Sequence, residues 1–151
     1  METDVRIAIC AALGVADDEV VNAVRLDNGV VRNLIELADA ERVLQLDPTA
    51  VSKPGFEGVS VLGSYPKENP ISYEIRNLTP ASLAVEDPVT GSLIAAASCW
   101  LDEQGRLGAG CIMAQGTAMG REGRAFVSVN SSGDVLIGGH SAVVIDGHVK
   151  L

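Results

Sequence analysis

The chain has 151 residues, the usual size of one domain, and its 47% hydrophobic and 21% charged residues are typical of a globular protein and exclude global disorder. Eleven Lys and Arg residues against 20 Asp and Glu give a net charge of −9; with 3% aromatic residues, such a surface repels phosphate backbones and excludes a nucleic-acid binder. No apolar run reaches the roughly 18 residues of a membrane-spanning helix, and residues 1–4 do not resemble a signal peptide, so we expect a cytoplasmic protein.

The first half of the chain predicts short helices and strands in alternation. Asn28-Gly29 lies between two β-prone runs and predicts a hairpin, because both residues tolerate the positive φ of a type I′ turn. Helical spacing of apolar residues, ended at Gly14 and at Asp47-Pro48, predicts two helices. In chain order we expect a helix at 3–13, strands at 20–26 and 30–37, a helix at 39–46, a strand at 58–63, an exposed loop at 64–70 and a strand at 71–78.

The last quarter of the chain is rich in β-prone runs that are separated by turn residues such as Asp146-Gly147. We expect strands at 111–115, 124–129, 135–138 and 142–145, and a further short strand at 149–151. The order of helices and strands favours an α+β fold with mostly antiparallel pairing over a doubly wound parallel sheet.

Between these parts, residues 91–101 predict a helix without a charged face. Charge comes only at its end, with Asp102 and Glu103. Such a helix cannot lie on a surface as an amphipathic helix does, and it is too short to cross a membrane. We therefore expect it to be buried on all sides, Trp100 included, with a strongly curved sheet wrapped around it.

The cysteines and histidines do not form a metal or redox motif. Cys10, Cys99 and Cys111 are odd in number and widely spaced, so we expect reduced and mostly buried thiols. His140 and His148 stand in strand-like sequence without other ligands nearby. We expect no transition-metal site.

The segment in front of the buried helix, residues 85–92, is a candidate anion site. A helix N-terminus has unpaired N–H groups and a partial positive charge. A substrate carboxylate would rest on the amides of Gly91 and Ser92 and on the side chain of Thr90 or Ser92, with Asp87 beside it as a proton carrier or hydrogen-bond partner. The alternative, which spacing alone favours, is that Asp87, Thr90 or Ser92 only caps the helix.

Three motifs follow one another along the chain. They are E-D-P-V-T-G-S at 86–92, Q-G-T-A-M-G-R-E-G-R at 115–124 and V-L-I-G-G-H-S-A-V at 135–143. Arg76 and Pro80 precede them in an R-x-x-x-P arrangement. In these residues the chain resembles the PhzF family, the phenazine-biosynthesis-like isomerases, and the resemblance spans nearly its whole length.

The resemblance implies a diaminopimelate epimerase fold, in which each of two similar domains is a curved sheet around a central helix. Family members are about twice this length, and this chain resembles their second, C-terminal domain, so we expect residues 1–151 to form one such domain. The first domain normally brings a catalytic Glu, in a segment like L-S-E-T, and an F-A-G-H-P motif. Neither is found here, and Glu74 and His140 do not stand in those contexts.

Carried onto the matching positions, the resemblance implies acid–base chemistry that moves a proton and a double bond without a metal or organic cofactor. Asp87 would take part in proton transfer or hold a substrate amine or hydroxyl. Gly91 and Ser92 would bind the substrate carboxylate, and Thr90 would support the turn. Leu93-Ile94 replace the small or polar residues common in the family, which would alter the pocket wall.

Three charged residues near these motifs are expected to be structural. Glu86 would be a solvated or capping neighbour of Asp87. Arg121 and Arg124 would pair with acidic neighbours or lie on a turn, although either one could neutralise a second acid group on a substrate.

Two kinds of function fit these observations. In the first, the chain is an isomerase of a small carboxylate, and a two-fold homodimer faces two Asp87 carboxylates across one cleft, so that their pKa values split into an acid and a base. In a variant of it, a first-domain-like chain supplies the missing glutamate in a heterodimer. In the second, the chain is a non-catalytic module that binds a small acid or a protein partner.

Overall fold

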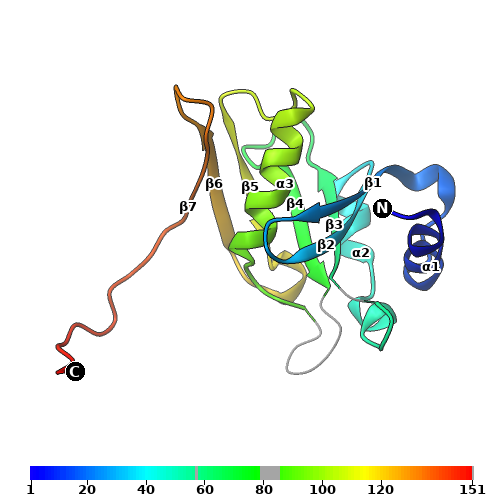
Figure 1. The fold of residues 1–151 in the computed structure, drawn as a ribbon, viewed down its shortest axis with the longest axis horizontal. Helices are drawn as coiled ribbons and strands as arrows, with labels where there is room; N and C mark the ends of the chain where they lie inside the picture. Colours follow the sequence, from blue (N-terminus) through cyan, green and yellow to red (C-terminus); the bar gives the residue numbers. More distant parts are fainter. Residues whose placement is uncertain (57, 79–85, 151) are drawn as a thin grey trace.

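The computed structural model describes residues 1–56, 58–78 and 86–150 (Figure 1). The strands of the described chain form one sheet and are β1 (Val20–Asp27), β2 (Val31–Leu37), β3 (Val59–Ser64), β4 (Tyr73–Leu78), β5 (Gly110–Gln115), β6 (Gly123–Val129) and β7 (Val135–Gly138). The helices are α1 (Thr3–Leu13), α2 (Ala40–Gln45) and α3 (Gly91–Glu103), with short 3-10 helices η1 (Asp17–Glu19), η2 (Pro48–Val51) and η3 (Thr117–Met119). None of the described helices combines the length and apolarity needed to cross a bilayer.

The order of strands in the sheet follows their order in the chain, from β1 to β7. Neighbouring strands are antiparallel except for the pairs β2–β3 and β4–β5, which are parallel. Parallel neighbours need a crossover connection, and α2 and α3 lie in these two connections. The predicted α+β class with mostly antiparallel pairing is confirmed.

The two crossover helices lie against different strands of the sheet. Helix α2 contacts β2, β3 and β4, whereas α3 contacts β1, β6 and β7, which lie at the two ends of the sheet (Figure 1). Because one helix reaches both ends, the sheet curves around it. The core beside α3 includes Leu34, Ile75, Leu93, Leu101 and Met113, and a second core beneath α1 and α2 includes Ile9, Ile35, Val43, Val61 and Leu78.

The sheet does not close around α3, and the expectation that this helix is buried on all sides is wrong. Most of its side chains are buried, but Ser92, Cys99 and Glu103 are exposed and Ala95 is half-buried. These four residues recur every three or four positions, so they form one stripe along the helix. The stripe is open because the edge strands β1 and β7 do not pair with each other.

The three cysteines are free thiols in different surroundings. Cys10 is buried, and burial raises the pKa of its thiol. Burial also raises the pKa of Cys111 to about 11, so this thiol stays protonated at neutral pH. Cys99 is exposed on the open stripe of α3 and departs from the expectation of mostly buried thiols.

The β1–β2 hairpin is confirmed, but its turn is not type I′. Asp27 pairs with Val31, so three residues connect the strands. Within the described chain only glycines have a positive φ, and in this loop Gly29 alone does, at 92°. The Asp27 side chain accepts a hydrogen bond from the Gly29 N–H and stabilises this longer turn.

Two predicted strands at the C-terminus are wrong as far as the structure describes them. Beyond Gly138 the chain leaves the sheet and runs without regular structure to residue 150 (Figure 1); residue 151 lies outside the described part. Val143, Val144, Ile145 and Val149 are 85–89% exposed. The β-prone sequence is present, but a strand also needs a neighbouring edge, and this segment points away from its own sheet.

Arg42 on α2 connects this helix to the segment that follows α1. Its Nε donates to Glu19 Oε1 at 2.6 Å, and its Nη2 donates to the Gly14 carbonyl at 2.7 Å. The hydrogen bond from Arg42, together with one from the Ala16 N–H, holds the pKa of Glu19 below its usual 4.5.

We predict that Glu19→Gln lowers the midpoint of urea unfolding at pH 7 but not in strong acid. The folded-state pKa is lowered, so the stabilisation is present above about pH 4.5 and is lost as the pH falls through the folded-state value. Unfolding of both proteins followed by circular dichroism across this range measures the difference. Glu41→Gln, on the exposed side of α2, is the control, and a difference that persists in strong acid would contradict the prediction.

Candidate active site at the start of α3

The N-terminus of α3 is open to an anion. Gly91 and Ser92 are exposed, and no described residue accepts a hydrogen bond from their N–H groups. Thr90 occupies the N-cap position, but no side chain caps the helix within the described chain. The capping interpretation is therefore not what the structure shows, and the positive end of the helix dipole is available.

The Thr90 hydroxyl fixes Asp87 in front of the helix. It donates to Asp87 Oδ2 at 2.6 Å and accepts from Asn77 Nδ2 at 2.9 Å and from Gln115 Nε2 at 3.1 Å. Gln115 also accepts from the Thr90 N–H and donates to the Asp87 carbonyl, at 2.8 and 2.9 Å. Thr90, Asn77 and Gln115 are buried. Thr90 is thus occupied in supporting the turn.

Asp87 is held through only one of its carboxylate oxygens. Oδ2 accepts from Thr90, whereas Oδ1 accepts no hydrogen bond from any described residue. The side chain is partly exposed and is bonded to Thr90, the residue directly before the free amides of Gly91 and Ser92. One oxygen therefore positions the carboxylate, and the other is free to exchange a proton or to bind a ligand.

The second motif supports this turn from β5 and β6. Gly116, which follows Gln115, has φ 87°, and a Cβ there would lie 2.7 Å from the Pro88 carbonyl oxygen. A Cβ on Gly123 would lie 2.6 Å from the Val89 Cγ2 atom. Only glycine fits at these positions, which lets both strands pack closely against the segment that carries Asp87.

Glu86 is buried, and the expectation of a solvated or capping neighbour is wrong. Its two carboxylate oxygens accept from Arg76 Nε and Nη2, at 2.9 and 2.7 Å. Arg76 Nη1 donates to the carbonyls of Val43 and Leu46 at the end of α2. Arg76 therefore joins β4, α2 and the segment in front of α3. Pro80, the other half of the R-x-x-x-P arrangement, lies outside the described residues.

Three residues near the site were not found by sequence reasoning. Asn28, at the tip of the β1–β2 hairpin, donates to the Ser92 carbonyl at 2.7 Å. Asn77 binds Thr90, and Arg32 Nη1 lies 3.4 Å from Asn77 Oδ1, with a buried Nε that has no described partner. Asn77 follows Arg76 directly, so that motif was the one available signal. Asn28 and Arg32 look like ordinary hairpin residues in the sequence.

The other candidate residues do not join this site. Glu74 is fully buried, and its Oε2 accepts from Tyr65 and Thr117, both at 2.9 Å. Burial and the bond to Glu74 raise the pKa of Tyr65 to about 12. Arg121 is exposed, and Arg124 donates to the Gly123 carbonyl, both around the turn between β5 and β6.

His140 and the acidic and sulfur side chains provide no metal centre in the described chain. His140 packs edge-on against Phe126, with ring centroids 5.0 Å apart. The described residues contain no group of three His, Cys, Asp or Glu side chains that could hold a metal ion.

Two solved structures share the fold of this chain. It is similar to the PhzF-family phenazine biosynthesis protein of Enterococcus faecalis, with a TM-score of 0.66 and 23% identity over 95% of this chain and 51% of that chain. It is also similar to the PhzF-family protein of Bacillus anthracis, with a TM-score of 0.61 and 13% identity over 85% of this chain and 49% of that chain. The chain spans about half the length of each.

The amino-acid sequence itself identifies the family. The family model for phenazine biosynthesis-like proteins, PhzC-PhzF, matches residues 2–147, and the chain belongs to this family. The resemblance found in the three motifs is thereby confirmed. A search of curated proteins gives no match.

We predict that Arg76→Met destabilises the fold by about 3–5 kcal/mol, because it leaves the Glu86 carboxylate buried without a partner. Urea unfolding monitored by circular dichroism measures the loss. The double variant Arg76→Met/Glu86→Leu removes the unpaired charge and should recover most of it. A single variant as stable as the parent would show that the pair does not hold this segment.

We predict that Thr90→Val costs about 1–3 kcal/mol of stability, because the amides of Asn77 and Gln115 lose a buried acceptor. Thr90→Ser keeps the hydroxyl and is the matched control. Thermal unfolding of the two variants under the same conditions gives the comparison, and equal midpoints would contradict the role given to this hydroxyl.

Proposed function

We propose that the chain is a cofactor-independent isomerase or epimerase that acts on a small carboxylate metabolite by acid–base proton transfer. The observation that carries this proposal is that Asp87, with one free oxygen, is held by Thr90, the residue directly before the unpaired amides of Gly91 and Ser92. Such a reaction requires a site that binds the substrate carboxylate and a proton carrier next to it. Family membership supports the same class of chemistry.

In this proposal the substrate carboxylate accepts hydrogen bonds from the N–H groups of Gly91 and Ser92 and from the Ser92 hydroxyl. Asp87 Oδ1 takes a proton from a substrate carbon or returns one to it, while Thr90 holds Oδ2. The proton that leaves one carbon is replaced at another carbon or on the opposite face, so the reaction needs no oxidant or reductant. Positioning by Thr90 fixes the direction of the transfer.

We further propose that the chain is one domain of diaminopimelate epimerase type, equivalent to the C-terminal domain of longer relatives, and that a second copy completes its active site. The chain spans about half of the similar structures, which favours a missing second half. In a two-fold homodimer the partner copy would bring a second Asp87 to the cleft, and two close carboxylates titrate as a coupled acid and base.

The test of this proposal follows proton exchange, so that the substrate need not be known in advance. Wild-type protein is incubated in D2O with a panel of small carboxylic acids, and NMR detects deuterium on carbon. We predict that Asp87→Asn lowers the exchange rate by about 10²- to 10⁴-fold, the usual contribution of a general acid or base.

Asp18→Asn, an exposed carboxylate on η1, is the control and should leave exchange unchanged. Exchange that survives in Asp87→Asn would overturn the assignment of Asp87. Binding of an acid without exchange by wild type would favour the non-catalytic module. Exchange that appears only after a first-domain-like chain is added would favour the heterodimer.

A further inference from the structure

We propose that residues 142–149 form a strand in the gap between β1 and β7 of a second copy of the chain. This inference deepens the proposed homodimer and rests on it, since it names the surface by which the two copies associate. Two observations support it. The segment is apolar but exposed in its own chain, and the described sheet has two free edges, β1 and β7, with the gap between them.

The segment has the pattern of a half-buried strand. In an extended conformation, Val143, Ile145 and Val149 lie on one side together with Gly147, whereas Val144, Asp146 and His148 lie on the other side, which is therefore more polar but not wholly so. The apolar side chains are nevertheless almost fully exposed, at 85–89%. Exposed apolar residues that share one side of an extended segment indicate a surface that is covered in the functional assembly.

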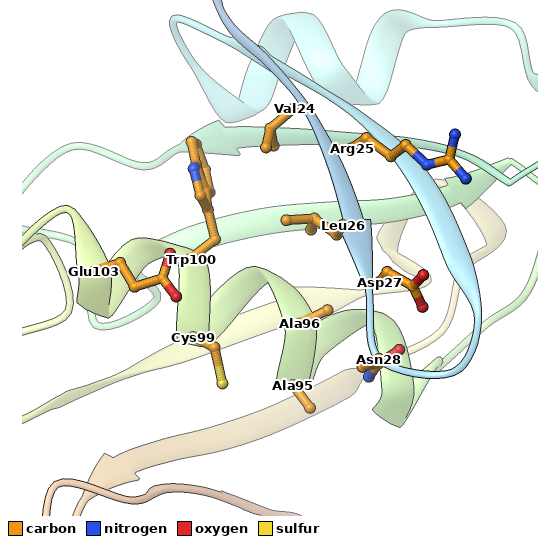
Figure 2. Close-up of a pocket in the computed structure, with 10 residues that line it drawn as sticks. All are labelled: Val24, Arg25, Leu26, Asp27, Asn28, Ala95, Ala96, Cys99, Trp100 and Glu103. Carbon is orange, nitrogen blue, oxygen red and sulfur yellow. The ribbon is translucent and has the colours of Figure 1, made fainter.

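The receiving gap lies along the open stripe of α3. Each of its two bordering strands has one paired neighbour in the described sheet, β2 for β1 and β6 for β7, so each has a free edge. A cavity of about 350 Å³ lies on the β1 side of this stripe and is lined by residues of β1 and α3, among them Val24, Leu26, Ala96, Cys99 and Trp100 (Figure 2). Ala95 and Cys99 lie on the side of α3 that is turned away from Val24 (Figure 2).

An inserted strand would pair with a free edge of the sheet and would also cover the open stripe of α3. Its backbone would pair with a free edge, and its apolar side would cover the small side chains of the stripe, which let a strand come close. The gap ends near the candidate active site, where Asn28 binds the Ser92 carbonyl. Insertion would therefore bring the partner copy next to that site.

The occupant that the structure favours is a second copy. The C-terminal tail, residues 139–150, leaves the end of β7 and points away from the gap of its own sheet (Figure 1). Each chain has one donor segment, residues 142–149, and one receiving gap. In a two-fold dimer each copy therefore inserts its segment into the gap of the other, and both gaps are filled. Each copy has a net charge of −9, so apolar contact and strand pairing must overcome repulsion between the copies, and added salt should strengthen the association.

The first test is the mass of the full chain by light scattering across a dilution series. We predict a wild-type mass of twice 15.7 kDa, and a mass of 15.7 kDa for Val143→Asp/Ile145→Asp, which places charge on the side that faces the gap. Val144→Asp is the matched control, because the same change on the opposite side should leave the dimer intact. Circular dichroism checks that all three proteins are folded.

The second test uses the exposed thiol in the gap. Oxidation of Ile145→Cys should link two chains through Cys99, and Val144→Cys should link them far less efficiently. Loss of the link in Ile145→Cys/Cys99→Ser would place the contact on α3. Equal linking by both single variants would overturn the proposed orientation of the strand.

The outcomes separate this inference from the proposed function. A monomeric wild type would overturn strand exchange, and so would a dimer that survives Val143→Asp/Ile145→Asp; in the latter case a homodimeric enzyme with another interface would still stand. Conversely, cross-linking through Cys99 together with unaltered exchange in Asp87→Asn would confirm the strand and overturn the catalytic proposal.

Discussion

The buried ion pair between Arg76 and Glu86 is the interaction on which the candidate site depends. Taking two charges out of water costs about as much as their attraction returns, so such a pair adds little net stability compared with apolar residues. What it supplies here is position. Arg76 reaches the carbonyl groups at the end of α2 as well as Glu86, so the residue directly before Asp87 is fixed to two other parts of the fold.

From this anchor the polar contacts become progressively less buried toward the solvent. Glu86 is fully paired, Thr90 is buried with three hydrogen-bond partners, and Asp87 is partly exposed with one oxygen free. A carboxylate that is held firmly at one oxygen keeps its direction without being neutralised by a direct cation. The neighbouring helix amides, also unpaired, complete a surface that is rigid and polar but unsatisfied, as a preorganised binding site should be.

The sequence predicted most helices and strands because apolar periodicity and turn residues are local properties. It also located the segment 85–92, first as a helix start and then by resemblance. It did not predict that Glu86 pairs with Arg76, because ten residues and a change of element separate them. The roles of Asn28 and Arg32 are equally invisible, since they follow from how a hairpin packs on a helix. The tail misled the prediction for the opposite reason: its local pattern is that of a strand, but a strand also needs a neighbour.

The agreement between strand order and chain order has a consequence for how the protein is made. Each strand of the sheet pairs with the strand synthesised just before it, so the sheet can grow in one direction as the chain leaves the ribosome. Helix α3 emerges after β4, when half of its surrounding sheet can already be in place, and β5 to β7 then extend the sheet around the other side of the helix. The two parallel pairs, β2–β3 and β4–β5, still join strands that a crossover helix separates in the chain, so their formation is the slower part of this growth.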